Sequence, residues 1–398
     1  MSFLSNRVEK LQESETLAMA RLGNELKEKG VAVINMSLGE PDFPTPDFVK
    51  LAAKDAIDKN FSYYTPVPGY KELLDSISNK FKRDNQLNYK TSQIVTSTGA
   101  KQSIINVVMA TVNPGDEVIL PAPYWVSYSE MVQLNEGKVV ALETNHKSDF
   151  KITPSQLEKA ITSKTKMFLF SNPCNPTGTM YNEKELRALG EVFKKNPHVL
   201  IVSDEIYEYI TFEDKMFSIG SIPELTNRTV TVNGLSKGFA MTGWRLGYIG
   251  APEDVAKACV KIQGQFTSGP SSITQRAAIT AVNADPSVVG TMREAFRKRR
   301  DLLISLMKEV PHIEVNNPGG AFYLFPEVSH YFGKKHAGTT IKDAKDLCMY
   351  LLNVGHVAMT PGGAFGAPNY IRLSYATSEE NIREAVARIK RSLAELQG

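Results

Sequence analysis

The chain has 398 residues, of which 42% are hydrophobic and 22% are charged, an ordinary balance for a globular protein of roughly two or three domains. The net charge of +3 argues against binding to nucleic acid or to an anionic membrane surface. No apolar stretch approaches the roughly 18 residues that cross a bilayer. Three distant cysteines and scattered histidines argue against a disulfide framework and a metal site.

Short apolar segments alternate with helix-like segments through the middle of the chain. The predicted strands are, in chain order, 94–96, 117–120, 138–142, 166–170, 199–203, 229–232 and 246–249. The clearest predicted helices are 100–112, 126–134 and 183–194. Apolar strands that alternate with helices are typical of an α/β fold with a mostly parallel sheet covered on both faces.

The pattern changes after about residue 290, where long helical stretches flank short strands at 320–325 and 370–374. The last predicted helix, 378–396, begins with acidic residues that suit a helix N-terminus. These elements predict a small α+β domain formed by residues 1–44 and 291–398, and a large domain formed by residues 45–290. The basic cluster 297–300 lies in one of the helices and is interpreted as a solvated helix face.

Lys237 lies in the segment 234–247, with Ser236 beside it and Arg245 further along the same segment. A lysine whose surroundings favour the neutral amine can form a Schiff base with a carbonyl group. Ser236 and Arg245 could hold a phosphate on the same ligand, the arginine through paired charge-assisted hydrogen bonds. The alternative is an ordinary surface lysine.

Asp204 and Tyr207 follow the predicted strand 199–203. Ligands bind outside the carboxyl ends of the strands in α/β sheets. Asp204 is therefore a candidate partner for a protonated pyridine nitrogen, and Tyr207 is a candidate hydrogen-bond donor to a phenolic oxygen. A helix cap after the strand is the alternative role of Asp204.

Three further turns also follow predicted strands. In the Pro- and Gly-rich turn 171–178, Asn175 points its amide either at a ligand oxygen or at its own backbone. The strand-to-helix crossing at Gly99 and Ala100 offers backbone N–H groups for a phosphate, although it contains neither a Walker A loop nor a dinucleotide fingerprint. Trp125 is either core or a stacking platform for a planar ring.

Together, these segments resemble the class I and II aminotransferases of the fold-type I pyridoxal-phosphate (PLP) family. The resemblance runs from Gly39-Glu40-Pro41-Asp42-Phe43 to Ser374-Tyr375 and is strongest toward the prokaryotic-type aspartate aminotransferases. Its motifs are Asn175-Pro176-Thr177-Gly178, Asp204 with Tyr207, Ser236-Lys237 with Arg245, and Arg372. It implies the PLP-dependent transferase fold, with a mostly parallel seven-stranded-type sheet in the large domain and a smaller α+β domain.

The resemblance also implies how PLP is held. Lys237 would bind it covalently and move a proton between substrate and cofactor, while Asp204 would keep the pyridine nitrogen protonated. Tyr207 and Asn175 would hydrogen-bond the ring oxygen, and Trp125 would lie against the ring. The phosphate would be held by Gly99, Ala100, Lys101, Ser236 and Arg245, with Tyr64 reaching across from the neighbouring subunit of a homodimer.

The substrate site is implied in the same way. Arg372 would clamp the α-carboxylate in a bidentate pair, with a domain-stabilising ion pair as its alternative role. Gly39 would offer a backbone N–H to the same carboxylate from a loop that closes over the substrate, and Trp125 and Asn175 would complete the pocket. Lys101 would meet the distal carboxylate of an acidic substrate or would only neutralise the cofactor phosphate.

The implied activity is amino transfer from L-aspartate to 2-oxoglutarate in a ping-pong cycle. An aromatic, prephenate or dual-specificity aminotransferase, a PLP β-lyase and a non-enzymatic binding protein are the alternatives. The expected partners are amino acids, 2-oxo acids and a second copy of the chain. Residues 14–16 could also belong to the pocket. The N-terminus lacks the apolar core of a signal peptide, so a cytoplasmic location is expected.

Overall fold

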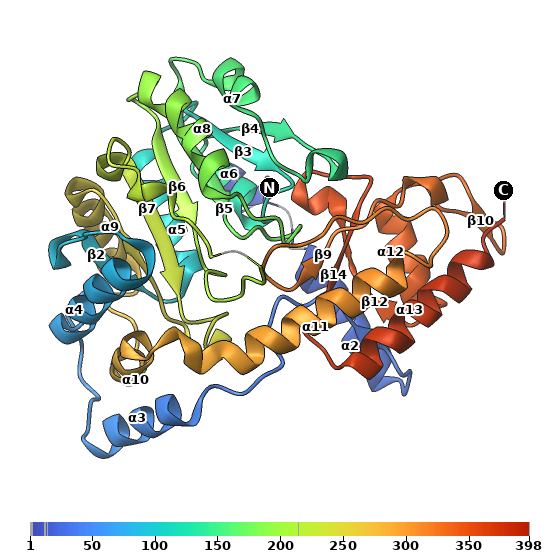
Figure 1. Ribbon diagram of the computed structural model, residues 1–398, viewed down its shortest axis with the longest axis horizontal. Coiled ribbons are helices and arrows are strands. Elements are labelled where there is room, and N and C mark those ends of the chain that lie inside the picture. The colour runs from blue at the N-terminus through green and yellow to red at the C-terminus, as the bar shows by residue number, and fades with distance from the viewer. Residues whose placement is uncertain (1–2, 12, 14, 214, 398) are drawn as a thin grey trace.

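The computed structural model of the protein describes residues 3–11, 13, 15–213 and 215–397. A seven-stranded sheet with the order β2-β8-β7-β6-β5-β3-β4 forms the centre of the larger part (Figure 1). In that order the strands are β2 (Ile94–Ser97), β8 (Gly247–Gly250), β7 (Thr229–Gly234), β6 (Leu200–Asp204), β5 (Thr165–Ser171), β3 (Glu117–Ala122) and β4 (Lys138–Glu143). Each of the seven predicted strand segments therefore forms a strand of one sheet.

The predicted α/β fold with a mostly parallel sheet is confirmed. Strands β4, β3, β5, β6 and β7 pair in parallel, whereas β8 is antiparallel to both of its neighbours, β2 and β7. An antiparallel pair needs no crossover helix, so the chain between β7 and β8 stays at the carboxyl edge of β7. This connection, residues 235–246, carries Lys237 and Arg245.

Alternate residues of the inner strands point into two separate hydrophobic clusters, as a strand buried on both faces requires. On one face, Val118 and Leu120 of β3 pack with α5 (Ala100–Thr111), α6 (Ser127–Leu134) and α9 (Glu253–Phe266). On the other face, Ile119 packs with α7 (Pro154–Ala160) and α8 (Glu183–Lys195). Beyond the β2 edge, three helices pack together: α3 (Asp47–Asp58), α4 (Lys71–Lys80) and α10 (Ser272–Asn283).

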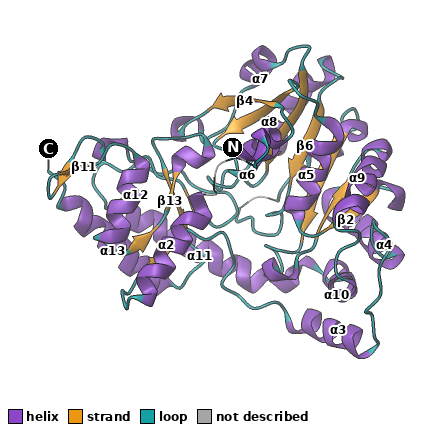
Figure 2. Cartoon of the chain, turned by 180° about the vertical axis from the view of Figure 1, so that it is seen from behind, coloured by secondary structure: helices purple, strands orange, loops and turns teal. Residues whose placement is uncertain are grey.

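The long helix α11 (Gly290–Met307) leads from the seven-stranded sheet to the C-terminal part (Figures 1 and 2). This part contains α12 (Ala344–Asn353), α13 (Glu379–Ala394) and an antiparallel sheet in the order β13 (Thr360–Pro361), β14 (Ile371–Ser374), β9 (Tyr323–Leu324). The predicted strand 320–325 is reduced to two residues. The physical reason is that Ala321 has a φ of 57° and Gly320 bridges to Thr211 instead.

The N-terminal segment packs on this C-terminal part. Helix α2 (Glu15–Glu28) contacts β12 (Val357–Ala358) and β13, and β1 (Ile34–Asn35) pairs in parallel with β12. The remaining α-helix is α1 (Asn6–Glu9), and the remaining strands are β10 (Lys335–His336) and β11 (Thr339–Thr340). The domain division at residues 44–45 and 290–291 stays a prediction, and its terminal residues 1, 2 and 398 lie outside the described residues.

The predicted solvated face at 297–300 is wrong for Arg300 and only partly right for Arg299, whose side chain is 12% exposed and pairs with Asp42 at 2.7 Å. Arg300 is buried, pairs with Glu213 and Asp301, and donates to the carbonyl of Pro318 at 3.0 Å. A run of four basic residues does not show which of them faces inward. Because α11 packs against other elements along its length, part of any such run must face inward.

No helix within the described ranges is long and apolar enough to cross a membrane. The described side chains of His, Cys, Asp and Glu form no group of three or more that could hold a metal ion. Cys174, Cys259 and Cys348 are free thiols.

Candidate active site

A cavity of about 310 Å³ lies at the carboxyl ends of β5, β6 and β7, where the C-terminal part meets the sheet. A larger cavity of about 560 Å³, beside Asp84 and Glu208, contains none of the predicted site residues, so size alone does not identify the site. The smaller cavity brings together residues predicted from distant segments: Gly39, Ala100, Lys101, Trp125, Asn175, Asp204, Tyr207, Ser236, Lys237, Arg245 and Arg372.

Two predicted residues do not line this cavity. Gly99 lies just behind the wall, with a φ of 87°, and a Cβ built there would overlap the guanidinium of Arg245. The side chain of Tyr64 is 99% exposed and lies outside the cavity of its own chain. Its predicted contact with a cofactor phosphate therefore requires a second chain.

One end of the cavity has the chemistry of an anion site. Helix α5 begins at Ala100, and its N-cap, Gly99, makes no side-chain cap, so the first N–H groups and the positive end of the helix dipole face the cavity. The Arg245 guanidinium donates to the carbonyl oxygens of Thr242 at 2.7 Å and Thr98 at 3.4 Å, which holds it beside this helix start. Ser236 completes the lining at this end.

Lys237 is a further residue of the cavity lining. Its Nζ donates to the carbonyl oxygen of Gly39 at 2.6 Å. Burial lowers the pKa of Lys237 to about 8, and the nearby cations Arg372 and Arg245 act in the same direction, against the attraction of Glu40 and Asp204. The amine is thus much easier to deprotonate than an exposed lysine.

Asp204 ends β6 at the floor of the cavity. Its Oδ2 accepts a hydrogen bond from the Tyr128 hydroxyl at 2.8 Å, and its Oδ1 accepts one from the backbone N–H of Ile206 at 3.3 Å. Burial raises the pKa of Asp204 to about 6, although these hydrogen bonds and Lys237 lower it. The carboxyl group therefore stays ionised at neutral pH and provides a buried negative charge for a cationic partner.

Arg372 is a buried cation without a carboxylate partner among the described residues. It donates from Nη1 to Asn175 Oδ1 at 2.8 Å and from Nη2 to the Ser37 carbonyl at 2.5 Å, and its buried Nε has no hydrogen-bond partner. Burial lowers the pKa of Arg372. Neither of these contacts is an ion pair, so they do not support the alternative role of Arg372 in a structural ion pair. A buried guanidinium without a carboxylate partner is suited to binding an anionic ligand.

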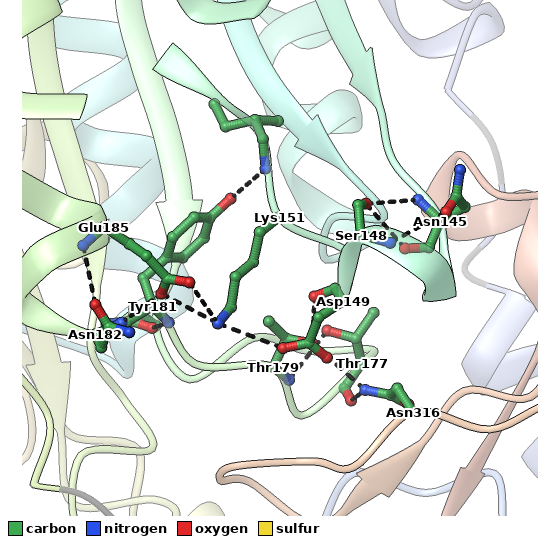
Figure 3. Close-up of polar contacts among 12 residues, drawn as sticks. Asn145, Ser148, Asp149, Lys151, Thr177, Thr179, Tyr181, Asn182, Glu185 and Asn316 are labelled. Carbon is green, nitrogen blue, oxygen red and sulfur yellow. Dashed lines mark hydrogen bonds and ion pairs between the residues drawn. The ribbon is translucent and has the colours of Figure 1, made fainter. Parts of the chain in front are cut away.

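The turn that carries Asn175 contains Thr177 and is followed by Thr179, and these two residues make hydrogen bonds to Asn316 and Asp149 (Figure 3). Asn316 Nδ2 donates to the Thr177 carbonyl at 3.0 Å, and Thr179 Oγ1 donates to the Asp149 carbonyl at 3.0 Å. Gly178 has a φ of 67°, and a Cβ there would lie 2.5 Å from Pro318 Cβ. These contacts fix the turn, so the Asn175 amide is held in place before any ligand binds.

Next to the anion site, the cavity combines a cation with an aromatic ring. The Nζ of Lys101 lies 5.0 Å from the Trp125 ring centroid, and burial, helped by Arg245, lowers the pKa of Lys101. Thr16 and Leu17 from α2 line the same cavity. Of the predicted residues 14–16, Thr16 lines the cavity, Glu15 does not line it and pairs with Lys345, and Ser14 lies outside the described residues.

Sequence reasoning missed two tyrosines of the site. Tyr128 lies three residues after Trp125, close to one helical turn, so its position on the same side as Trp125 was a usable signal. Tyr323 contacts Tyr207 with 2.7 Å between the hydroxyl oxygens, and no local pattern indicates this because the residues are far apart in the chain. Sequence reasoning also missed a hydrogen bond from the Thr242 hydroxyl to the Glu40 carboxylate beside the cavity.

Comparisons with known proteins cover almost the whole chain. Residues 31–389 match the family described as aminotransferase class I and II. The aspartate/prephenate aminotransferase of Cereibacter sphaeroides is 46% identical over 393 residues, which are 98% of each protein. A bifunctional aspartate aminotransferase and glutamate/aspartate-prephenate aminotransferase of Petunia hybrida is 45% identical over 399 residues, or 99% of this chain and 83% of the relative.

Solved structures have the same architecture. The aspartate aminotransferase of Rhizobium meliloti has a TM-score of 0.96 and 41% identity, with 100% of both chains covered. The aspartate aminotransferase of Thermus thermophilus, solved with maleate, has a TM-score of 0.92 and 39% identity, with 98% of this chain and 100% of that chain covered.

Proposed function

The chain belongs to the class I and II aminotransferases, whose cofactor is PLP, and we propose that it transfers the amino group of L-aspartate to 2-oxoglutarate. The cavity fits PLP on three counts: an anion site at the start of α5, a buried carboxylate at the end of β6, and a lysine amine between them. When bound, PLP supplies a protonated ring that accepts electrons from the α-carbon of the substrate.

Lys237 is the residue that we expect to bind PLP and to move the proton. With a pKa of about 8, about a tenth of the amine is neutral at pH 7, far more than for an exposed lysine. The neutral Nζ is the nucleophile toward an aldehyde carbon. Once free, the same atom could take the proton from the substrate α-carbon and give it to the former aldehyde carbon of the cofactor.

Asp204 and Tyr207 would fix the two polar positions of the ring. The Asp204 carboxylate would accept a hydrogen bond from the protonated pyridine nitrogen, and its buried position makes this charge pairing strong. The hydrogen bond from Tyr128 keeps the carboxylate ionised despite its burial. The Tyr207 hydroxyl and the Asn175 amide would bind the phenolic oxygen.

The observation that carries the proposal for the substrate is the buried Arg372 guanidinium with its unpartnered Nε. A carboxylate that entered here would pair with Arg372 and would accept a hydrogen bond from the Gly39 backbone, which already lies beside Lys237. The α-carbon would then be held next to the amine that must take its proton, which supplies the orientation that amino transfer needs.

Lys101 would select an acidic side chain. Because Arg245 is available to bind the phosphate, the Lys101 amine remains for the distal carboxylate of aspartate, beside Trp125. A second candidate substrate, prephenate, is favoured by the names of relatives such as the Cereibacter sphaeroides enzyme. A ring-bearing dicarboxylate of this kind could use the same amine and pack on Trp125 and Leu17 at the same cavity.

We further propose that the protein acts as a cytoplasmic homodimer. Tyr64 is nearly fully exposed and lies in a segment whose neighbour Tyr63 is also exposed, a combination that is suited to burial against a second chain. In such a dimer, Tyr64 would contribute to the phosphate site of its neighbour. A monomer by sedimentation, with PLP fully bound, would contradict this part of the proposal.

The absorption spectrum of the protein saturated with PLP tests the function directly. We expect L-aspartate to convert the visible band of the bound aldehyde form into the band of the amine form, and 2-oxoglutarate to reverse the change. L-Phenylalanine serves as the comparison substrate, and prephenate serves as an alternative acceptor. Release of pyruvate and ammonia without the amine form would favour a β-lyase, and no response to any amino acid would contradict an aminotransferase.

A further inference from the structure

We propose that Tyr323 is a positioning residue of this site, whose hydroxyl group orients the Tyr207 hydroxyl toward the cofactor and determines that position 39 must be glycine. The first half of this inference rests on the proposed function. The second half depends only on packing.

Tyr323 belongs to the C-terminal sheet and reaches across to the residues that follow β6. It is fully buried on β9, paired with Ser374 of β14. Its hydroxyl oxygen lies 2.7 Å from that of Tyr207, and the two rings meet edge to face at 5.8 Å. The Arg372 guanidinium lies 4.6 Å from the Tyr323 ring centroid. The ring is thus held between Tyr207 and Arg372, so its hydroxyl has little freedom to move.

The proton arrangement of the two hydroxyls follows from their environment. Burial raises the pKa of both tyrosines, so both are protonated at neutral pH, and each has a single proton to donate. Tyr207 is the hydrogen-bond partner of the Tyr323 hydroxyl among the described residues. If Tyr323 donates to Tyr207, the Tyr207 proton is free for a ligand oxygen in the cavity, which is the arrangement that the cofactor site requires.

The same hydroxyl limits the residue at position 39. A Cβ built on Gly39 would overlap the Tyr323 hydroxyl oxygen, whereas the next nearest atoms, Cζ and Cε1 of the same ring, would lie at ordinary contact distances of 3.5 and 3.7 Å. Gly39 is not among the glycines with a positive φ, so its backbone conformation is open to alanine. The requirement for glycine therefore comes from one oxygen atom, which belongs to a residue 284 positions further along the chain (323 − 39).

Displacement of Gly39 would reach the centre of the site. Its carbonyl oxygen accepts the hydrogen bond from Lys237, and its neighbour Glu40 accepts one from Thr242. Tyr323 thus acts on the site from two sides: on the residue proposed to bind the ring oxygen and on the segment that contacts the lysine amine.

A double-mutant cycle tests the packing half of the inference. Thermal unfolding is measured for the PLP-saturated protein, Gly39→Ala, Tyr323→Phe and the double variant. We expect Gly39→Ala to lower Tm by roughly 2–5 °C in the natural background, as overpacking does, and by less than about 1 °C when Tyr323 is phenylalanine. An equal loss of Tm from Gly39→Ala in both backgrounds would overturn the packing half of the inference.

Tyr375→Phe is the matched control. Tyr375 is equally buried and follows the same sheet, but its hydroxyl donates to the Ala321 carbonyl at 3.4 Å. Gly39→Ala should cost as much in this background as in the natural one. Relief of the Gly39→Ala loss by Tyr375→Phe would mean that general loosening of the sheet, and not the Tyr323 hydroxyl, explains the effect.

A spectroscopic titration tests the orienting half. A donor on the ring oxygen of PLP stabilises its deprotonated form, so loss of the Tyr323 hydroxyl should raise the pH at which the visible band changes, by about half a unit. Tyr375→Phe should leave this pH unchanged, and an unchanged or lowered value for Tyr323→Phe would refute the orienting role. A natural protein that binds no PLP would refute the proposed function instead, and the Tm cycle would still decide the packing half.

Discussion

Two buried charged clusters meet at the end of β6, and they differ in how their charges are paired. The cavity cluster consists of Asp204 and Lys237, whose hydrogen-bond partners among the described residues carry no charge: Tyr128, Ile206 and Gly39. The packed cluster consists of Lys80, Asn85, Glu205 and Glu208. Within it, Lys80 Nζ donates to Asn85 Oδ1 at 2.7 Å and to Glu208 Oε2 at 2.5 Å, and Asn85 donates to Glu205 Oε2 at 3.2 Å.

The stronger perturbation does not belong to the cluster that we propose as functional. Burial raises the pKa of Glu205 to about 8, with the charge of Glu208 adding to it, whereas burial raises that of Asp204 only to about 6. A perturbed pKa therefore indicates burial, which both clusters share. What distinguishes the cavity cluster is that its charges have no oppositely charged hydrogen-bond partner among the described residues, whereas Lys80 pairs with Glu208. Each prediction below tests that distinction.

The largest expected effect comes from Lys237→Ala. It should lower the rate of amino transfer from aspartate by about 10⁴-fold or more, because the nucleophile and the proton carrier are lost together. The folded protein should remain, with Tm changed little, because removal of a buried cation offsets the loss of its hydrogen bond to the Gly39 carbonyl. PLP binding without a covalent bond remains possible and is measured by equilibrium dialysis. Near-natural activity would show that the cavity cluster is not catalytic.

Lys80→Ala is the corresponding test of the packed cluster. It leaves the Glu208 carboxylate buried without its cation, a change that costs about 3–5 kcal/mol of unfolding free energy. Urea denaturation should report this loss, while the folded fraction should keep the PLP spectrum of the natural protein. Loss of activity without loss of stability would mean that the packed cluster takes part in the reaction.

The neighbouring carboxyls allow a comparison of isosteric changes. Asp204→Asn should lower the rate by about 10²–10³-fold, as expected when a preorganised charge is removed from a reacting group. Glu205→Gln should leave the rate within about twofold at pH 7, because the Glu205 carboxyl is already neutral there. Steady-state kinetics of both variants, with PLP saturating, would separate the two roles.

The pH dependence of stability provides the control for Glu205. Its folded pKa lies above the ordinary value of 4.5, so its contribution to stability is fully present below about pH 4.5 and is lost as the pH rises to about 8. Glu205→Gln should therefore flatten the fall in Tm between these pH values. A fall that is unchanged in the variant would mean that Glu205 does not titrate in this range.

The charge state of Lys237 sets the next prediction. Because its pKa is about 8 and the neutral amine is the nucleophile, recombination of the PLP-free protein with PLP should speed up about tenfold per pH unit below pH 8 and then level off. Stopped-flow growth of the visible band measures this rate. A plateau that begins only near pH 10 would indicate a lysine with an ordinary pKa.

Lys101→Ala has a smaller expected effect than Lys237→Ala or Asp204→Asn, and it sharpens the substrate assignment within the cavity. It should lower kcat/KM for aspartate about tenfold or more while changing that for phenylalanine little, because the lost charge faces the distal carboxylate. PLP affinity, measured in parallel, should change less than aspartate binding. An equal loss for both amino acids would reduce Lys101 to a phosphate contact.

The sequence determined the sheet and indicated most of the residues that line the cavity. Apolar runs and the turns that follow them are local signals, so the seven strands and the positions of Asn175, Asp204 and Lys237 after them were readable from the chain. Parallel strands bring their carboxyl ends to one edge, which is why residues that are distant in sequence line one cavity. The motifs also indicated the family, which the comparisons confirm.

Only the tertiary structure decided the contacts between the two parts. The antiparallel direction of β8, the inward position of Arg300, and the meeting of Tyr323 with Tyr207 and Gly39 depend on packing between elements that no local pattern couples. The pKa values of Lys237 and Asp204 are decided in the same way, because burial and neighbouring charges exist only in the folded chain. Tyr64 does not line the cavity of its own chain, so its predicted contact with a phosphate site requires a second copy of the chain.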